Sequence, residues 1–155
     1  MALDAELIVV DSQVVDVSEG TSQLSTAGGS VENVNLLTLG RRGFTRDSTF
    51  VVVIEAVTAA GANVIPVQFI LQVAPDGTNY VDVSTIELTL AASLAKTGVW
   101  SAPIGLRDFV VEQRETTDMK VRVKVTYTNN GETDDFTYSA YIAGPGHGYS
   151  TDVAI

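Results

Sequence analysis

The stretch from Lys120 to Ile142, KVRVKVTYTNNGETDDFTYSAYI, contains the clearest structural pattern in the chain. Apolar and polar side chains alternate on both sides of a polar segment, with apolar positions at Val121, Val123, Val125, Tyr127, Phe136, Tyr138, Ala140 and Ile142. Alternation with a period of two is typical of strands that bury one face. Because an Asn-Gly pair lies between the two runs, the stretch predicts one β-hairpin with an apolar face turned to a core.

Two strongly apolar segments lie in the middle of the chain. Thr49–Ala56 has apolar side chains on both faces, which predicts a strand covered on both sides. Val64–Val73 has one unbroken apolar face, with Gln68 and Gln72 on the opposite face. Pro66 has no backbone N–H to donate to a neighbouring strand, so we expect an edge or a bulge there.

The remaining strand patterns are shorter or irregular. Between Tyr80 and Leu90 the apolar positions change phase, which predicts a bulge near Ser84 and Thr85. Further strands are predicted at Glu6–Val10, Val14–Val17, Asn35–Leu39, Val99–Pro103 and Asp108–Glu112. Frequent strands without alternating helices favour an all-β protein, a sandwich or a barrel.

The pattern predicts one all-β domain with about eight antiparallel strands. A length of 155 residues fits one domain. Residues 1–34 are expected to form an N-terminal arm and flexible loop, because Ser18–Ser30 is rich in Gly, Ser and Thr. The sandwich core is expected over residues 35–143, and residues 144–155 are expected to form a C-terminal tail.

Composition argues against several classes of function. The net charge is −10, from nine basic and 19 acidic residues, whereas nucleic-acid binding needs cationic groups that contact phosphate. The chain has no cysteine for a thiolate metal site and no apolar stretch long enough for a membrane-spanning helix. The sequence therefore predicts no direct nucleic-acid partner and no membrane partner.

The sequence offers no group of residues suited to catalysis. The only histidine, His147, lies in a Gly-rich tail, away from any recognisable nucleophile motif. We therefore predict that the protein is not an enzyme and has no cofactor or bound metal. One alternative stays open at Asn129–Asp135, where six oxygen-bearing side chains are either a solvated loop or a calcium site.

Three arginines are clustered in this acidic chain, at Arg41, Arg42 and Arg46. They form either a solvated connection or a docking site for an acidic neighbour through bidentate contacts with carboxylates.

Several stretches together resemble the jelly-roll capsid cement (decoration) proteins of tailed bacteriophages. They are LDAELIVVDSQVV (3–15), NLLTLG (35–40), FVVVIEAVTAAGANVIPVQFILQVAPDGTNYVDVST (50–85), VRVKVTY (121–127) and FTYSAYI (136–142). The resemblance implies a jelly-roll-like β-sandwich, a homotrimer, and binding to the major capsid protein at threefold and quasi-threefold positions. It also implies a place on the outer surface of the virion, after synthesis in the host cytoplasm. The run Ser18–Val34 and the tail depart from the family pattern.

The predicted function is therefore structural: a trimer that clamps neighbouring capsid subunits against internal DNA pressure. The predicted contact residues are Arg41, Arg42, Arg46, Leu3, Leu7 and Tyr149. The alternative is a carbohydrate-binding or tail-associated recognition module, which would need exposed aromatic side chains. The aromatic residues that fall outside the predicted inner faces are Tyr80, Tyr141 and Tyr149.

Overall fold

The computed structural model describes residues 8–18, 20–24, 49–60, 63–74, 78–91, 98–104, 120–129 and 133–143. Every regular element in these ranges is a strand: β1 (Ile8–Asp16), β2 (Ser22–Leu24), β3 (Thr49–Thr58), β4 (Val64–Ala74), β5 (Val81–Ala91), β6 (Gly98–Pro103), β7 (Lys120–Tyr127) and β8 (Asp135–Ala143). In this part of the chain no helix is long and apolar enough to cross a membrane.

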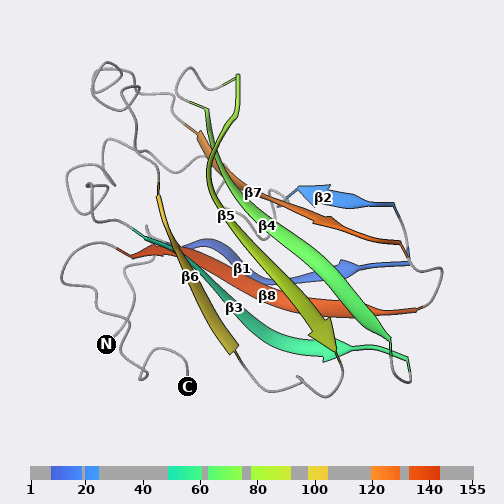
Figure 1. Cartoon of the computed structure of the whole chain (residues 1–155). Helices are drawn as coiled ribbons and strands as arrows, with labels where there is room; N and C mark the ends of the chain where they lie inside the picture. The colour runs from blue at the N-terminus through green and yellow to red at the C-terminus, as the bar shows by residue number, and fades with distance from the viewer. Residues whose placement is uncertain are drawn as a thin grey trace, which may run out of the picture.

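The strands form two four-stranded antiparallel sheets, with the orders β1-β8-β3-β6 and β2-β7-β4-β5 (Figure 1). The pairs β1·β8, β2·β7, β3·β6 and β4·β5 join the first four strands to the last four in reverse order. This is the pairing of one long antiparallel hairpin wrapped around a core, which is a jelly roll. The predicted all-β, jelly-roll-like sandwich of about eight antiparallel strands is confirmed.

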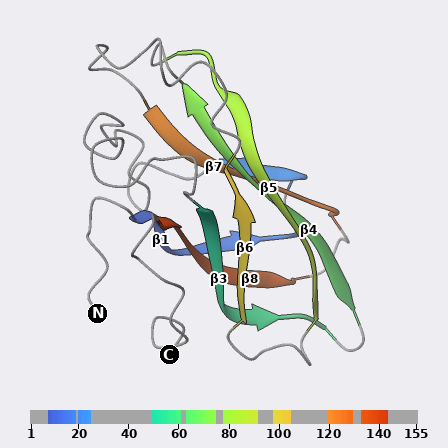
Figure 2. The ribbon, with the colours of Figure 1, turned by 60° about the vertical axis from the view of Figure 1, so that its left-hand side comes forward.

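The prediction that Lys120–Ile142 forms one hairpin is wrong. β7 lies between β2 and β4 in one sheet, whereas β8 lies between β1 and β3 in the other (Figure 2). Residues 128–134 therefore cross from one sheet to the other, and this connection is longer than the two-residue loop of a tight hairpin. Alternation shows only that each strand turns an apolar face inward, and two strands that face each other across a core satisfy this equally well.

The interior contains the residues that the alternation places there. All of the predicted core positions belong to one buried cluster: Val121, Val123, Val125, Tyr127, Ile65, Val67, Phe69, Leu71, Phe136 and Tyr138. The ring of Phe69 in β4 lies 5.8 Å from that of Phe136 and 5.0 Å from that of Tyr138, both in β8. These contacts join the two sheets, and each fully buried large apolar side chain contributes about 1.5–3 kcal/mol.

The boundary predicted between an N-terminal arm and a core that starts at residue 35 is also wrong. β1 and β2 both lie within residues 1–34, and Val9 and Val10 are 1% and 0% exposed. The two short apolar runs predicted there form the single strand β1, because its register with β8 shifts between Val10 and Gln13. Such a bulge keeps both runs facing inward despite the polar residues between them. The strands predicted at Asn35–Leu39 and Asp108–Glu112 lie outside the described residues.

Of the irregularities predicted in the central strands, the bulge in β5 is confirmed, whereas Pro66 lies in a central strand, is paired with Thr89 of β5 and is not at a bulge. β4 is paired with β7 only from Val67 onward, so Pro66 lies just beyond the ladder on that side. In β5, Leu71 of β4 is paired with Ser84 and the next residue with Asp82, which leaves Val83 as the extra residue of a bulge. The bulge lies one residue before the predicted position.

β3 is covered on both faces, as its sequence predicts. Its inner side chains belong to the central core, and Val51 on the outer face is 0% exposed. Val51 forms a second buried cluster with Tyr141 and Ala143 of β8. One part of this outer sheet face is therefore apolar and buried.

Candidate functional site

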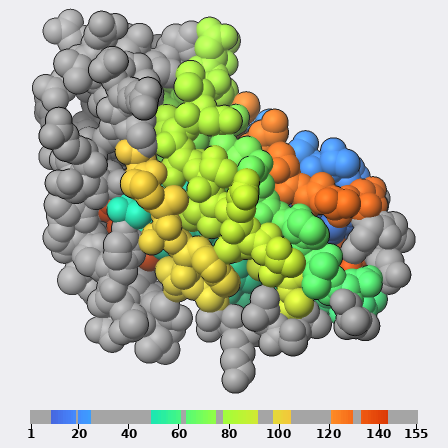
Figure 3. Space-filling model, viewed as in Figure 1, coloured from blue at the N-terminus to red at the C-terminus, as the bar shows by residue number. Residues whose placement is uncertain are grey.

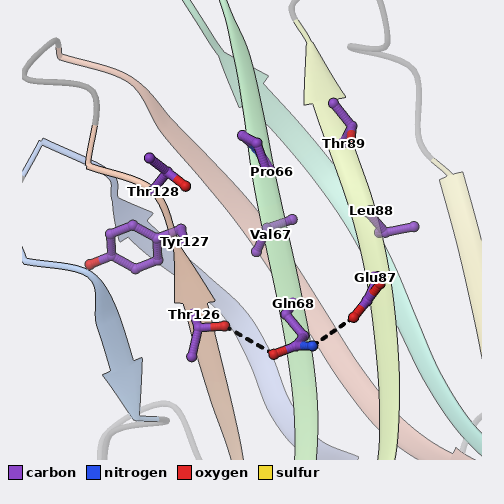
Figure 4. A pocket seen from close by; sticks show the side chains of 9 residues that line it. All are labelled: Pro66, Val67, Gln68, Glu87, Leu88, Thr89, Thr126, Tyr127 and Thr128. Atoms are coloured by element: carbon purple, nitrogen blue, oxygen red, sulfur yellow. Dashed lines mark hydrogen bonds between the residues drawn. The ribbon is translucent and has the colours of Figure 1, made fainter.

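The outer face of the β2-β7-β4-β5 sheet contains side chains that are linked across its strands. Gln68 of β4 is paired with Thr126 of β7 and with Glu87 of β5. Its Nε2 donates a hydrogen bond of 2.7 Å to Oε1 of Glu87, and its Oε1 accepts one of 3.3 Å from Oγ1 of Thr126 (Figure 4). The amide of Gln68 is therefore held in one orientation, between a hydroxyl and a carboxylate.

A second row of the same kind runs across the sheet at Gln72. Nε of Arg122 donates to Oε1 of Gln72 at 2.8 Å, and Nε2 of Gln72 donates to Oδ1 of Asp82 at 2.7 Å. The guanidinium of Arg122 also lies 3.6 Å from the centre of the Tyr80 ring, a cation–π contact. Four residues of three segments thus hold each other in place, so these side chains would lose little freedom if a molecule bound to this face.

An open groove lies beside the first row, with a volume of about 560 Å³. Its lining comes from β4, β5 and β7 and the residue after β7: Pro66, Val67, Gln68, Glu87, Leu88, Thr89, Thr126, Tyr127 and Thr128. Figure 3 shows the side chains of these three strands next to one another on the surface. The polar lining is of hydroxyl and amide groups with one carboxylate, so the groove is suited to hydrogen bonding with a polar partner.

The bulge in β1 forms a polar cluster on the outer face of the other sheet. Ser12 has a φ of 46°, a left-handed conformation that a serine rarely adopts. Its N–H donates to Oγ of Ser139 at 2.9 Å, and its hydroxyl donates to Oε2 of Glu55 at 2.9 Å. Ser139 also contacts this carboxylate. These bonds stabilise the bulge and hold the Ser12 hydroxyl as a donor to the Glu55 carboxylate.

The predicted contact residues Arg41, Arg42, Arg46, Leu3, Leu7 and Tyr149, and also His147, lie outside the described residues. Two of the three aromatic candidates are described. Tyr141 is only 6% exposed, because its ring belongs to the buried cluster on the outer side of β3, so it is not a surface platform. Tyr80 is half-buried and lies under Arg122. The exposed large apolar side chains of the described chain are aliphatic: Val14, Leu24, Val64 and Val81.

The loop considered for calcium is anchored to the protein. Asp134 is 0% exposed; its Oδ1 accepts a hydrogen bond of 2.9 Å from the N–H of Ala60, and its carbonyl accepts one from Val17. One of the six oxygen-bearing side chains thus points inward, and residues 130–132 lie outside the described ranges. Within those ranges, no group of three or more acidic, histidine or cysteine residues is placed to hold a metal ion.

The sequence predicts that Gln68 and Gln72 point outward, and the structure confirms this. The partners of the two glutamines follow from the register of three strands, which the alternation alone does not provide. Comparisons with protein-family models, with curated protein sequences and with solved structures found no match.

Proposed function

We propose that the protein is a structural cement (decoration) protein of a tailed-phage capsid. As a homotrimer it binds the outside of the shell and clamps neighbouring copies of the major capsid protein against the pressure of the packaged DNA. The proposal rests on the pre-organised polar face of the β2-β7-β4-β5 sheet, where Gln68 and Gln72 are held by partners on both sides. The resemblance of the sequence to cement proteins supports it.

A clamp of this kind works by many weak contacts rather than by chemistry. Each hydrogen bond to the shell contributes only about 0.5–1.5 kcal/mol. Three copies in one trimer raise the effective concentration of every contact after the first, so their contributions combine into stable attachment. A net charge of −10 also suits a position outside the shell, because an acidic protein and DNA repel each other.

The second candidate is a carbohydrate-binding or tail-associated recognition module, and the groove at Gln68 favours it. Hydroxyl, amide and carboxylate groups line the groove and match the hydroxyls of a sugar. However, sugar rings commonly stack on exposed aromatic faces. Tyr141 is buried and Tyr80 is covered by Arg122, so neither of these two rings offers such a platform.

Size-exclusion chromatography with light scattering and thermal release of DNA from particles test the proposal together. We expect a trimer in solution, and we expect decorated particles to retain DNA to a higher temperature than particles without the protein. A monomer that binds glycans would support the recognition module instead. Equal DNA release from decorated and undecorated particles would contradict the clamp.

A pair of variants tests which face docks. Gln68→Arg replaces the centre of the first polar row with a bulky cation, and we expect it to reduce binding to particles. Val14→Arg is the matched control, because Val14 is 56% exposed on the outer face of the other sheet. If Val14→Arg reduces binding and Gln68→Arg does not, the proposed docking face is wrong.

A further inference from the structure

The edge strands β1 and β2 lie on the same side of the molecule (Figures 1 and 2). Each of them has one glutamine whose side chain points into the sandwich. Gln13 of β1 is paired with Tyr138, and Gln23 of β2 is paired with Val125. Directly opposed residues of an antiparallel pair lie on the same sheet face. Since Tyr138 and Val125 belong to the core, both glutamine side chains are directed inward.

The side chain of Gln13 spans the space between the two sheets. Its Nε2 lies 3.5 Å from the carbonyl oxygen of Leu24, so it reaches β2 directly beside Gln23. Tyr138, whose ring has a hydroxyl group, is the residue of β8 that is paired with Gln13. The register and this contact therefore bring polar groups from β1, β2 and β8 to one side of the core.

Three atoms of these side chains are buried without a hydrogen-bond partner among the described residues: Oε1 of Gln13, Oε1 of Gln23 and the hydroxyl of Tyr138. Gln13 is 8% exposed and Tyr138 is 0% exposed, whereas Gln23 is half-buried but its Oε1 is covered, so bulk water does not solvate these three atoms. Buried polar atoms in folded proteins nearly always have a partner, because leaving one unpaired costs free energy. These atoms therefore need a ligand that accepts one hydrogen bond and donates two.

We propose that Gln13, Gln23 and Tyr138 form a binding site for one buried water molecule between the two sheets. The water donates to the two amide oxygens and accepts a hydrogen bond from the phenol, and three bonds are typical of internal water. Burial raises the pKa of Tyr138, so its hydroxyl keeps the proton that it donates. A metal cation is a poor fit, because none of the three side chains is a carboxylate that would offset its desolvation.

Magnetic relaxation dispersion of water nuclei, which counts long-lived internal waters, tests the site directly. We expect Gln23→Met, which keeps the length of the side chain but removes its acceptor, to have one long-lived water fewer than the wild type. The matched control is Gln72→Met. Gln72 is also 8% exposed, but both of its amide groups are paired within the protein, so we expect no change in the count. Equal counts in the wild type and Gln23→Met would overturn the proposal.

Thermal unfolding of Tyr138→Phe gives a second test, in which the direction of the change in melting temperature decides the outcome. If the hydroxyl binds the internal water, its removal leaves that water short of one bond, and the melting temperature falls. A hydroxyl that is buried without any partner would give the opposite result, because its removal relieves an unpaired group. A melting temperature equal to or above that of the wild type would therefore overturn the proposal. If Gln23→Met does not fold, Gln13→Met serves in the relaxation measurement.

Discussion

Val67 tests whether the inward face of β4 is assigned correctly. It is 4% exposed in the central cluster, so Val67→Asp would place a carboxylate among apolar side chains. An unpaired buried charge costs about 3–5 kcal/mol, and we expect the domain to unfold or to melt at a much lower temperature. Val64→Asp is the control on the same strand, since Val64 is 52% exposed and its substitution should change stability little. Similar melting of both variants would contradict the assignment.

The carboxylate of Asp16, at the end of β1, should make the stability of the folded protein depend on pH. The hydroxyl and the N–H of Ser18 donate to its carboxylate and lower its pKa below the ordinary value of 3.8. A lowered pKa means that the ionised carboxylate stabilises the folded state above the unfolded pKa. This contribution is lost as the pH falls through the lower, folded value. NMR titration should show the lowered pKa, and Ser18→Ala should raise it. An unchanged pKa in Ser18→Ala would contradict the role of the hydroxyl.

The separation of β7 and β8 into opposite sheets can be tested with introduced cysteines, because the chain has none of its own. Val14 of β1 and Thr137 of β8 are directly paired, and paired Cα atoms lie about 4.5–5.5 Å apart, within disulfide reach. We expect Val14→Cys with Thr137→Cys to form a disulfide on mild oxidation, as measured by mass spectrometry. Thr126→Cys with Thr137→Cys is the control that a β7–β8 hairpin would bring together. A disulfide in this second pair alone would contradict the jelly-roll pairing.

The three clustered arginines predict how the whole protein binds a shell. If Arg41, Arg42 and Arg46 dock on an acidic capsid surface, replacing all three with Glu should weaken particle binding strongly. Because the sequence places them on a charged connection, we expect the melting temperature to change little. Co-sedimentation with particles at increasing salt measures the effect, and wild-type binding should also weaken as salt screens these contacts. Binding by the triple variant that equals the wild type would exclude these arginines from the interface.

Much of the fold could be predicted from local patterns. The inner faces of β4, β7 and β8 follow from alternation with a period of two, which depends only on neighbouring residues in the chain. The phase change in β5 likewise marks an irregularity, because it breaks a local rule of strand pairing. The groove and its polar rows could not be predicted, because they depend on which residues of other strands lie beside Gln68 and Gln72.

The sequence by itself determined that this chain is an all-β protein, and which side chains of its central strands form the core. Only the tertiary structure decided that β7 and β8 belong to opposite sheets, that β1 is part of the sandwich, and that Tyr141 is buried on an outer face. The physical reason is the difference between local and non-local constraints. Alternation specifies the direction of each side chain, whereas the choice of neighbouring strand depends on how all eight apolar faces are buried together around one core.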